Sequence, residues 1–117
     1  MKGVKKMLFD LKGKLEHLKQ EQDEEDFRGE KQDYKFSGLP FRMTRVFMET
    51  FKDEYLLLIW HAIIKINSIK GEKERIQVFI YDNKKFYAVS TWENGTKAED
   101  YVNPEELSVV FMMPSDY

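Results

Sequence analysis

The stretch YLLLIWHAIIKINSI, residues 55–69, decides the fold because two different periods can be drawn through it. Apolar residues occupy every even position from 56 to 66, and a period of two predicts a strand with one buried face. A helical period fits as well, since Ile59 and Ile63 each lie three or four residues from other apolar residues of the stretch. Because β-branched isoleucine favours strands, we predict a strand here, with Trp60 on its buried face.

The segments that follow predict a series of hairpins. Apolar or alternating runs predict strands at residues 75–81, 86–92, 98–102 and 108–113. The turn before the third of these strands contains Asn94-Gly95, the strongest short hairpin signal in the chain. Asn103, Pro104 and Glu106 stand in the positions of a helix start, so one helical turn is expected before the last strand.

The segment from Phe41 to Phe51 is the most ambiguous part of the chain. Met43, Phe47 and Phe51 lie at the four-residue spacing of a helix face, whereas the β-branched residues between them suit a strand. We expect a strand that turns at residues 52–54 into the next one.

The N-terminal residues carry a narrow apolar stripe. Its members recur at spacings of four and three residues, which predicts one face of an amphipathic helix; they are Val4, Leu8, Leu11, Leu15 and Leu18. We expect this helix to pack on the protein's own sheet, and the alternative is a homodimer formed through the same stripe.

These elements together predict an α+β fold in one domain. Residues 1–26 form the N-terminal amphipathic helix with an acidic end, residues 27–40 a charged linker, and residues 41–117 a mainly β body. The body is expected to be an antiparallel meander of five or six strands, built as a small SH3-like or OB-like barrel. Such an architecture names no function.

Composition excludes several classes of protein. The chain has 117 residues, a net charge of −2 and no cysteine, so disulfides, thiolate metal sites and a cysteine nucleophile are excluded. Charged residues interrupt the N-terminal apolar positions, which argues against a signal peptide. No apolar run approaches the roughly 20 residues of a membrane span. We expect a cytoplasmic protein with no membrane contact.

Catalytic signatures are absent from the sequence. His17 and His61 stand in no spacing that links them to each other or to an acid. No serine lies in a nucleophile-elbow context, and the six glycines form no phosphate-binding loop. We therefore expect a protein that is not an enzyme and has no catalytic residue, no metal site and no cofactor.

Charge is concentrated near the N-terminus. Residues 1–20 carry six lysines against two acids, and residues 21–34 carry seven acids against two basic residues. Our candidate partner-binding residues come from this acidic run, and they are Asp23, Glu24, Glu25, Asp26 and Glu30. They suit an adaptor or inhibitor that binds a basic protein surface. The simpler interpretation of a charge run is a solvated linker.

An alternative function is single-stranded nucleic-acid binding. The run Lys84, Lys85, Phe86 and Tyr87 places basic residues beside aromatic ones on an expected strand, as single-strand binders do. It lacks the glycines of the known sheet-binding pattern, and the body has no basic excess to attract phosphates. Protein binding is therefore the first expectation. The size and composition of the chain are typical of small interaction proteins encoded by phages and mobile elements.

Overall fold

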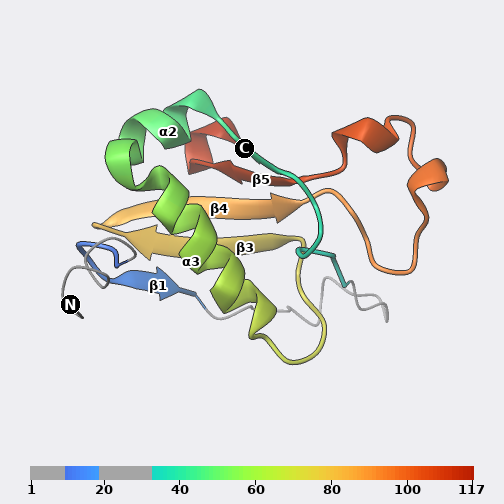
Figure 1. Cartoon of the computed structure of the whole chain (residues 1–117), viewed down its shortest axis with the longest axis horizontal. Coiled ribbons are helices and arrows are strands. Elements are labelled where there is room, and N and C mark those ends of the chain that lie inside the picture. Colours follow the sequence, from blue (N-terminus) through green and yellow to red (C-terminus); the bar gives the residue numbers. More distant parts are fainter. Residues whose placement is uncertain (1–9, 19–32) are drawn as a thin grey trace, which may run out of the picture.

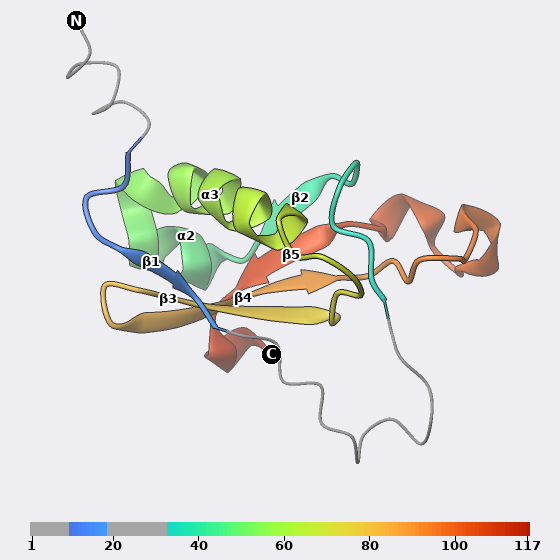
Figure 2. The same cartoon turned by 90° about the horizontal axis from the view of Figure 1, so that it is seen from below.

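The computed structural model describes residues 10–18 and 33–117, which form an α+β fold (Figure 1). A helical segment at residues 45–67 covers one face of a five-stranded sheet, and the C-terminal turn lies on the other side (Figure 2). The strands lie in the order β1-β3-β4-β5-β2. Their bounds are Leu15–His17 for β1, Phe41–Met43 for β2, Ile76–Tyr81 for β3, Lys84–Ser90 for β4 and Val109–Met112 for β5.

The centre of the sheet follows the predicted hairpins. β3 and β4 pair antiparallel, and β4 pairs antiparallel with β5, which confirms the strands expected at 75–81, 86–92 and 108–113. Asp82 and Asn83 connect β3 to β4 with positive φ angles of 52° and 60°, as a tight two-residue hairpin turn requires. The local sequence is sufficient to predict this hairpin because the strand pattern and the residues of the turn agree.

The sheet is open, so the predicted barrel is wrong. β2 pairs parallel with β5 and lies at the opposite edge from β1, and these two short strands do not meet. The expected antiparallel meander is therefore a mixed sheet. The physical reason is that residues 45–67, where strands are expected, form helices that cover one face of the sheet, and the two edge strands β1 and β2 have only three residues each.

The segment from Phe41 to Phe51 combines both interpretations. After β2, the side chain of Thr44 accepts a hydrogen bond from the backbone N–H of Phe47 at 3.2 Å and caps helix α2, Arg45–Phe51. A 3₁₀ turn, η2 (Lys52–Glu54), then leads into helix α3 (Tyr55–Asn67). The prediction of a strand over most of residues 41–51 is therefore wrong.

Residues 55–69 form a helix, which corrects the central prediction. α3 buries Leu58, Ile59, Ala62 and Ile66, a set with helical spacing. Trp60 belongs to the other side of the helix and is 48% exposed, so its predicted place in the core is wrong. Both periods fitted because almost every position in the stretch is apolar. The sheet offers one face to cover, and a helix covers it.

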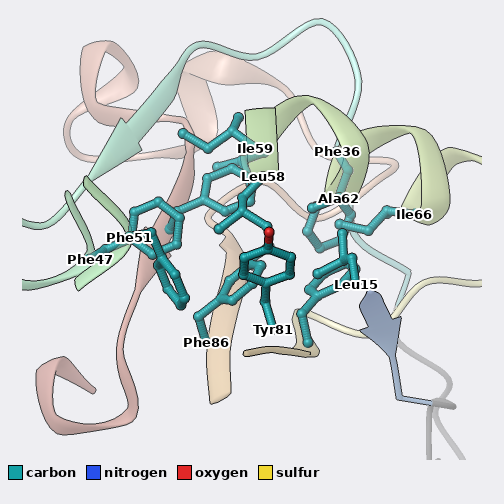
Figure 3. Close-up of a cluster of buried hydrophobic side chains, with 14 of the residues drawn as sticks. Leu15, Phe36, Phe47, Phe51, Leu58, Ile59, Ala62, Ile66, Tyr81 and Phe86 are labelled. Carbon is teal, nitrogen blue, oxygen red and sulfur yellow. The ribbon is translucent and has the colours of Figure 1, made fainter. Parts of the chain in front are cut away.

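Phenylalanine rings fill the space between the helices and the sheet. Phe86 on β4 is fully buried, and its ring centroid lies 5.3 Å from that of Phe47, 5.4 Å from Phe51 and 5.2 Å from Phe79. Figure 3 shows the helix side chains converging on Phe86 and Tyr81 of the sheet. One continuous core thus joins α2 and α3 to β3 and β4.

The N-terminal stripe is not one face of a helix in the described residues. Residues 10–14 are irregular, and Leu15–His17 form β1, antiparallel to β3. Leu15 is buried in the core, and the backbone N–H of Leu18 donates to the carbonyl of Val78 at 2.9 Å. The helix prediction is therefore wrong here, and Leu15 is unavailable for pairing chains. Val4 and Leu8 lie outside the described residues.

The free edge of β3 explains this outcome. A short helix gains little stability by itself, whereas a strand placed along this edge satisfies backbone N–H and C=O groups that would otherwise lack partners. Gly13 adds a local reason, because a Cβ atom there would lie 3.3 Å from the ring of Tyr81. The chain must pass close to that ring before β1 begins.

The region after β4 contains turns instead of a strand. The residues expected as a strand at 98–102 contain the 3₁₀ turn η3 (Ala98–Asp100), so that prediction is wrong. The helical turn expected before the last strand is confirmed as η4 (Pro104–Glu106). Asn94-Gly95 does not join two strands, because Glu93 forms an isolated bridge with Tyr34. Pairing with residues 33–35 replaces the local hairpin, since the N–H of Lys35 donates to the carbonyl of Trp92 and the N–H of Asn94 to that of Asp33, both at 2.8 Å.

Residues from all three predicted parts of the chain share one core. Leu15 comes from residues 1–26, and Phe36 and Leu39 come from residues 27–40. They pack with the helix and sheet residues of the body. The boundaries at 26 and 40 stay a prediction.

Candidate interaction surface

The outer face of α3 presents large apolar side chains to solvent. Leu56 is 62% exposed, Trp60 48% and Ile64 50%. Successive members are four residues apart, so they lie in one row over two turns of the helix. We call these three side chains the α3 ridge.

Charge is nearly absent from this helix. Lys65 is the one charged residue among the thirteen of α3, although 34% of the whole chain is charged. Lys65 itself is half-buried, and the other polar residues after Tyr55 in this helix are His61 and Asn67. A helix that is apolar on both sides is normally covered on both sides. The α3 ridge therefore has the composition of an interface.

The opposite side of α3 packs against the sheet and fixes the position of the α3 ridge. Leu58, Ala62 and Ile66 are fully buried against the sheet, and the ring of Trp60 packs edge-on against His61 at 5.3 Å between centroids. A side chain on a packed helix loses little further freedom when a partner binds it. The surface is therefore preorganised for contact.

Sequence reasoning missed the α3 ridge because it assigned Trp60 to a strand core. The signal that identifies it is the lack of charge over the whole of residues 55–64, which fits a helix buried on all sides better than a half-exposed strand. Exposed apolar patches on otherwise polar proteins commonly mark interaction sites.

The predicted nucleic-acid run is divided between the two faces of the sheet. Phe86 is buried in the core, while Lys84 and Lys85 are exposed at the β3–β4 hairpin. Tyr87 points to the opposite face, where its ring lies 6.0 Å from that of the C-terminal Tyr117. The four residues therefore form no common surface for stacking bases.

The predicted acidic site cannot be placed. Asp23, Glu24, Glu25, Asp26 and Glu30 lie outside the described residues. Their role as a partner site stays a prediction based on charge alone.

The two histidines occupy different environments. His17 is half-buried on β1, where its ring stacks on Phe79 at 4.3 Å and its Nε2 lies 2.8 Å from Oε1 of Gln77. His61 lies on α3 beside the ridge. Within the described residues no group of three His, Asp or Glu side chains could hold a metal ion.

Burial lowers the pKa of His17 from its ordinary value of 6.5. The hydrogen bond to Gln77 opposes this shift, and the nearby Lys65 ammonium adds to it. A lowered pKa means that the folded state favours the neutral ring, so the unfolded chain takes up a proton more readily. The stability that His17 contributes is therefore present above pH 6.5 and lost as the pH falls through the folded-state pKa.

We expect the free energy of unfolding to depend on pH through His17. The wild type should lose stability between pH 7.5 and about pH 5, and the variant His17→Gln should lose less over the same range. Urea midpoints of both proteins at the two pH values measure the difference. Equal losses would show that His17 does not change its protonation environment on folding.

No protein-family model, curated protein or solved structure matches the chain. No helix in the described ranges is long and apolar enough to cross a membrane.

Proposed function

We propose that this chain is a small non-catalytic protein-interaction module, of the adaptor or inhibitor type, that docks through the outer face of α3. The observation that supports this most is the α3 ridge, an exposed apolar row with no charged residue on it. Covering such a surface removes apolar area from water, which is the main favourable term in protein association.

Trp60 is the expected anchor of the interface. Tryptophan is enriched among the few residues that supply most of the binding energy of protein interfaces. Its position between Leu56 and Ile64 surrounds it with apolar neighbours that would exclude water from the contact. A nucleic acid is a poor fit for this face, since phosphates need cations and the α3 ridge supplies none.

The acidic run fits the same proposal as a steering element. Asp23, Glu24, Glu25 and Asp26 would attract a partner with a basic rim, and exposed charges act mainly on the association rate. The α3 ridge, in contrast, would set the dissociation rate, because its short-range apolar contacts exist only in the formed complex and must break before the partners separate. Replacing the four acids with Asn or Gln should therefore slow association and weaken its salt dependence.

Single-stranded nucleic-acid binding is the second candidate. Tyr87 and Tyr117 lie together on the open face of the sheet, and Arg75 donates from a guanidinium nitrogen to the Tyr117 hydroxyl. Lys84 and Lys85 project from the adjacent hairpin. This arrangement is weaker than the α3 ridge because Tyr117 already packs against Tyr87.

Capture from a lysate of the source cells tests the proposal. Immobilised wild-type protein should retain a stoichiometric protein after nuclease treatment, and Trp60→Lys should retain at least tenfold less. The control Val102→Lys changes a side chain that is 95% exposed on the loop between η3 and η4, away from α3, and should bind as the wild type does. Loss of all partners with nuclease, or equal capture by Trp60→Lys, would contradict the proposal.

A further inference from the structure

We propose that Asn94 is a site of spontaneous covalent modification, in which its side-chain amide is lost as ammonia through a cyclic imide formed with the backbone nitrogen of Gly95. This inference does not use the α3 ridge and goes beyond the proposed function. It assigns a chemical role to the Asn94-Gly95 pair, which does not connect two strands of the sheet.

The pair lies exposed in a tight turn. The backbone N–H of Thr96 donates to the carbonyl of Glu93 at 3.3 Å, which closes the turn around Asn94 and Gly95. Gly95 has a φ of 90°, and a Cβ atom placed on it would meet no atom beyond its chain neighbours within 4 Å. Glycine has no side chain to shield its own nitrogen and rotates freely about its backbone bonds. The nitrogen of Gly95 is therefore sterically open to the side chain that precedes it.

The reaction needs only water and these two residues. The backbone nitrogen of Gly95 gives its proton to hydroxide and attacks Cγ of Asn94, so that a C–N bond forms. The side-chain nitrogen takes up a proton and leaves as ammonia, which completes the cyclic imide. Water then opens the ring at either carbonyl and yields aspartate or isoaspartate at position 94. No oxidation or reduction takes place, and the attack is favoured because both groups belong to adjacent residues.

The other three asparagines of the chain lack this combination. Asn103 is followed by proline, which has no backbone N–H to give up. Asn67 is the last residue of helix α3, and Asn83 lies in the turn between β3 and β4. Both are followed by residues whose side chains shield the attacking nitrogen. They provide a comparison within the same molecule.

Asn94 also holds two distant segments together. Its backbone N–H donates to the carbonyl of Asp33 at 2.8 Å, and its Nδ2 donates to Oδ2 of Asp33 at 3.0 Å. The other carboxylate oxygen of Asp33, Oδ1, accepts from the backbone N–H of Lys73 at 2.8 Å. We call these three hydrogen bonds the Asp33 clamp. It ties the residues before Phe36 to the loop that follows β4.

Modification converts the donor of the clamp into a second acceptor. A carboxylate at position 94 has no proton to give to Oδ2 of Asp33, and two negative charges then face each other where 3.0 Å now separates donor and acceptor. The isoaspartate product also lengthens the backbone of the turn by one methylene group. We therefore expect the modified chain to carry one more negative charge and to lose the side-chain half of the clamp.

Incubation at mildly alkaline pH, followed by peptide mapping with isoaspartate detection, measures the reaction on the full chain. Modification at Asn94 should be at least tenfold faster than at Asn67, Asn83 or Asn103. Its rate should rise with pH, because the attacking nitrogen must lose its proton. A rate at Asn94 no greater than at the other three positions, or a product without isoaspartate, would overturn the proposal.

Substitutions test the effect on the clamp. Asn94→Asp reproduces the aspartate product and should lower the urea midpoint of unfolding. Combining it with Asp33→Asn exchanges donor and acceptor and should restore at least half of that loss. Asn103→Asp is the matched control, since it adds the same charge at an exposed position of the same loop and should change the midpoint less. An unchanged midpoint in Asn94→Asp, or a double variant no more stable than the single one, would contradict the role of the clamp.

Discussion

Replacing Phe86 with alanine is expected to lower the free energy of unfolding by about 3–5 kcal/mol. Phe86 is fully buried, and its ring contacts rings from α2, β3 and β5. Its removal leaves a cavity that the surrounding rings cannot fill without leaving their own packing positions. Since a domain of this size has only about 5–15 kcal/mol of stability, the variant should be visibly unstable.

Trp60→Ala is the matched comparison. Trp60→Ala removes at least as many side-chain atoms as Phe86→Ala, but Trp60 lies on the exposed side of α3. We expect it to change the free energy of unfolding by about 1 kcal/mol or less, since surface substitutions away from the core have small effects. Urea denaturation of both variants, measured at low protein concentration, gives the difference. A Trp60→Ala variant less stable than Phe86→Ala would place Trp60 in the core after all.

Replacing Tyr81 with phenylalanine is expected to lower the free energy of unfolding by about 1–3 kcal/mol. The Tyr81 hydroxyl donates to Oε2 of Glu54 at 2.8 Å and accepts from the backbone N–H of Gly13 at 2.9 Å. The same Oε2 atom accepts from the backbone N–H of Lys12 at 3.0 Å. One hydroxyl thus joins β3, the residue before α3 and the chain leading into β1.

This cluster also predicts an alkaline effect. Burial raises the pKa of Tyr81 from its ordinary value of 10.0, and the hydrogen bond and charge of Glu54 act in the same direction against the Gly13 hydrogen bond. The folded state therefore favours the neutral phenol, and the stability it gives is present below pH 10 and lost as the pH rises through the folded-state pKa.

Urea midpoints at about pH 8 and pH 10.5 test the assignment. Tyr81→Phe should start lower than the wild type and lose less between the two pH values. Some loss should remain in the variant, because burial also raises the pKa of Tyr34. Equal alkaline losses in the wild type and Tyr81→Phe would contradict the role of this hydroxyl.

The candidate surface shows how far the sequence could identify a site. The acidic run and the run Lys84 to Tyr87 are visible as charge and composition, and both were selected from the sequence. The α3 ridge is visible as part of an uncharged apolar stretch, but its exposure depends on which side of the helix faces the sheet. The period of two through the even positions predicts that Trp60 is buried, whereas helical spacing places it on the exposed side. The sequence alone does not decide between the two.

The sequence by itself determined the parts of the fold whose signals are local. β3 and β4 alternate around a turn whose two residues tolerate positive φ, so pattern and turn agree within residues 76–90. β5 and the turn η4 before it are likewise specified by a short apolar run and a proline start. In these segments the nearest neighbours in sequence are also the partners in space.

The tertiary structure alone decided the segments whose partners are distant. Residues 55–67 are apolar enough for either period, and they became a helix because one face of the sheet had to be covered. Leu15 to His17 became β1 because the edge of β3 offered backbone partners more than sixty residues away. Both choices follow from burial and backbone pairing across the assembled sheet, which no local propensity contains.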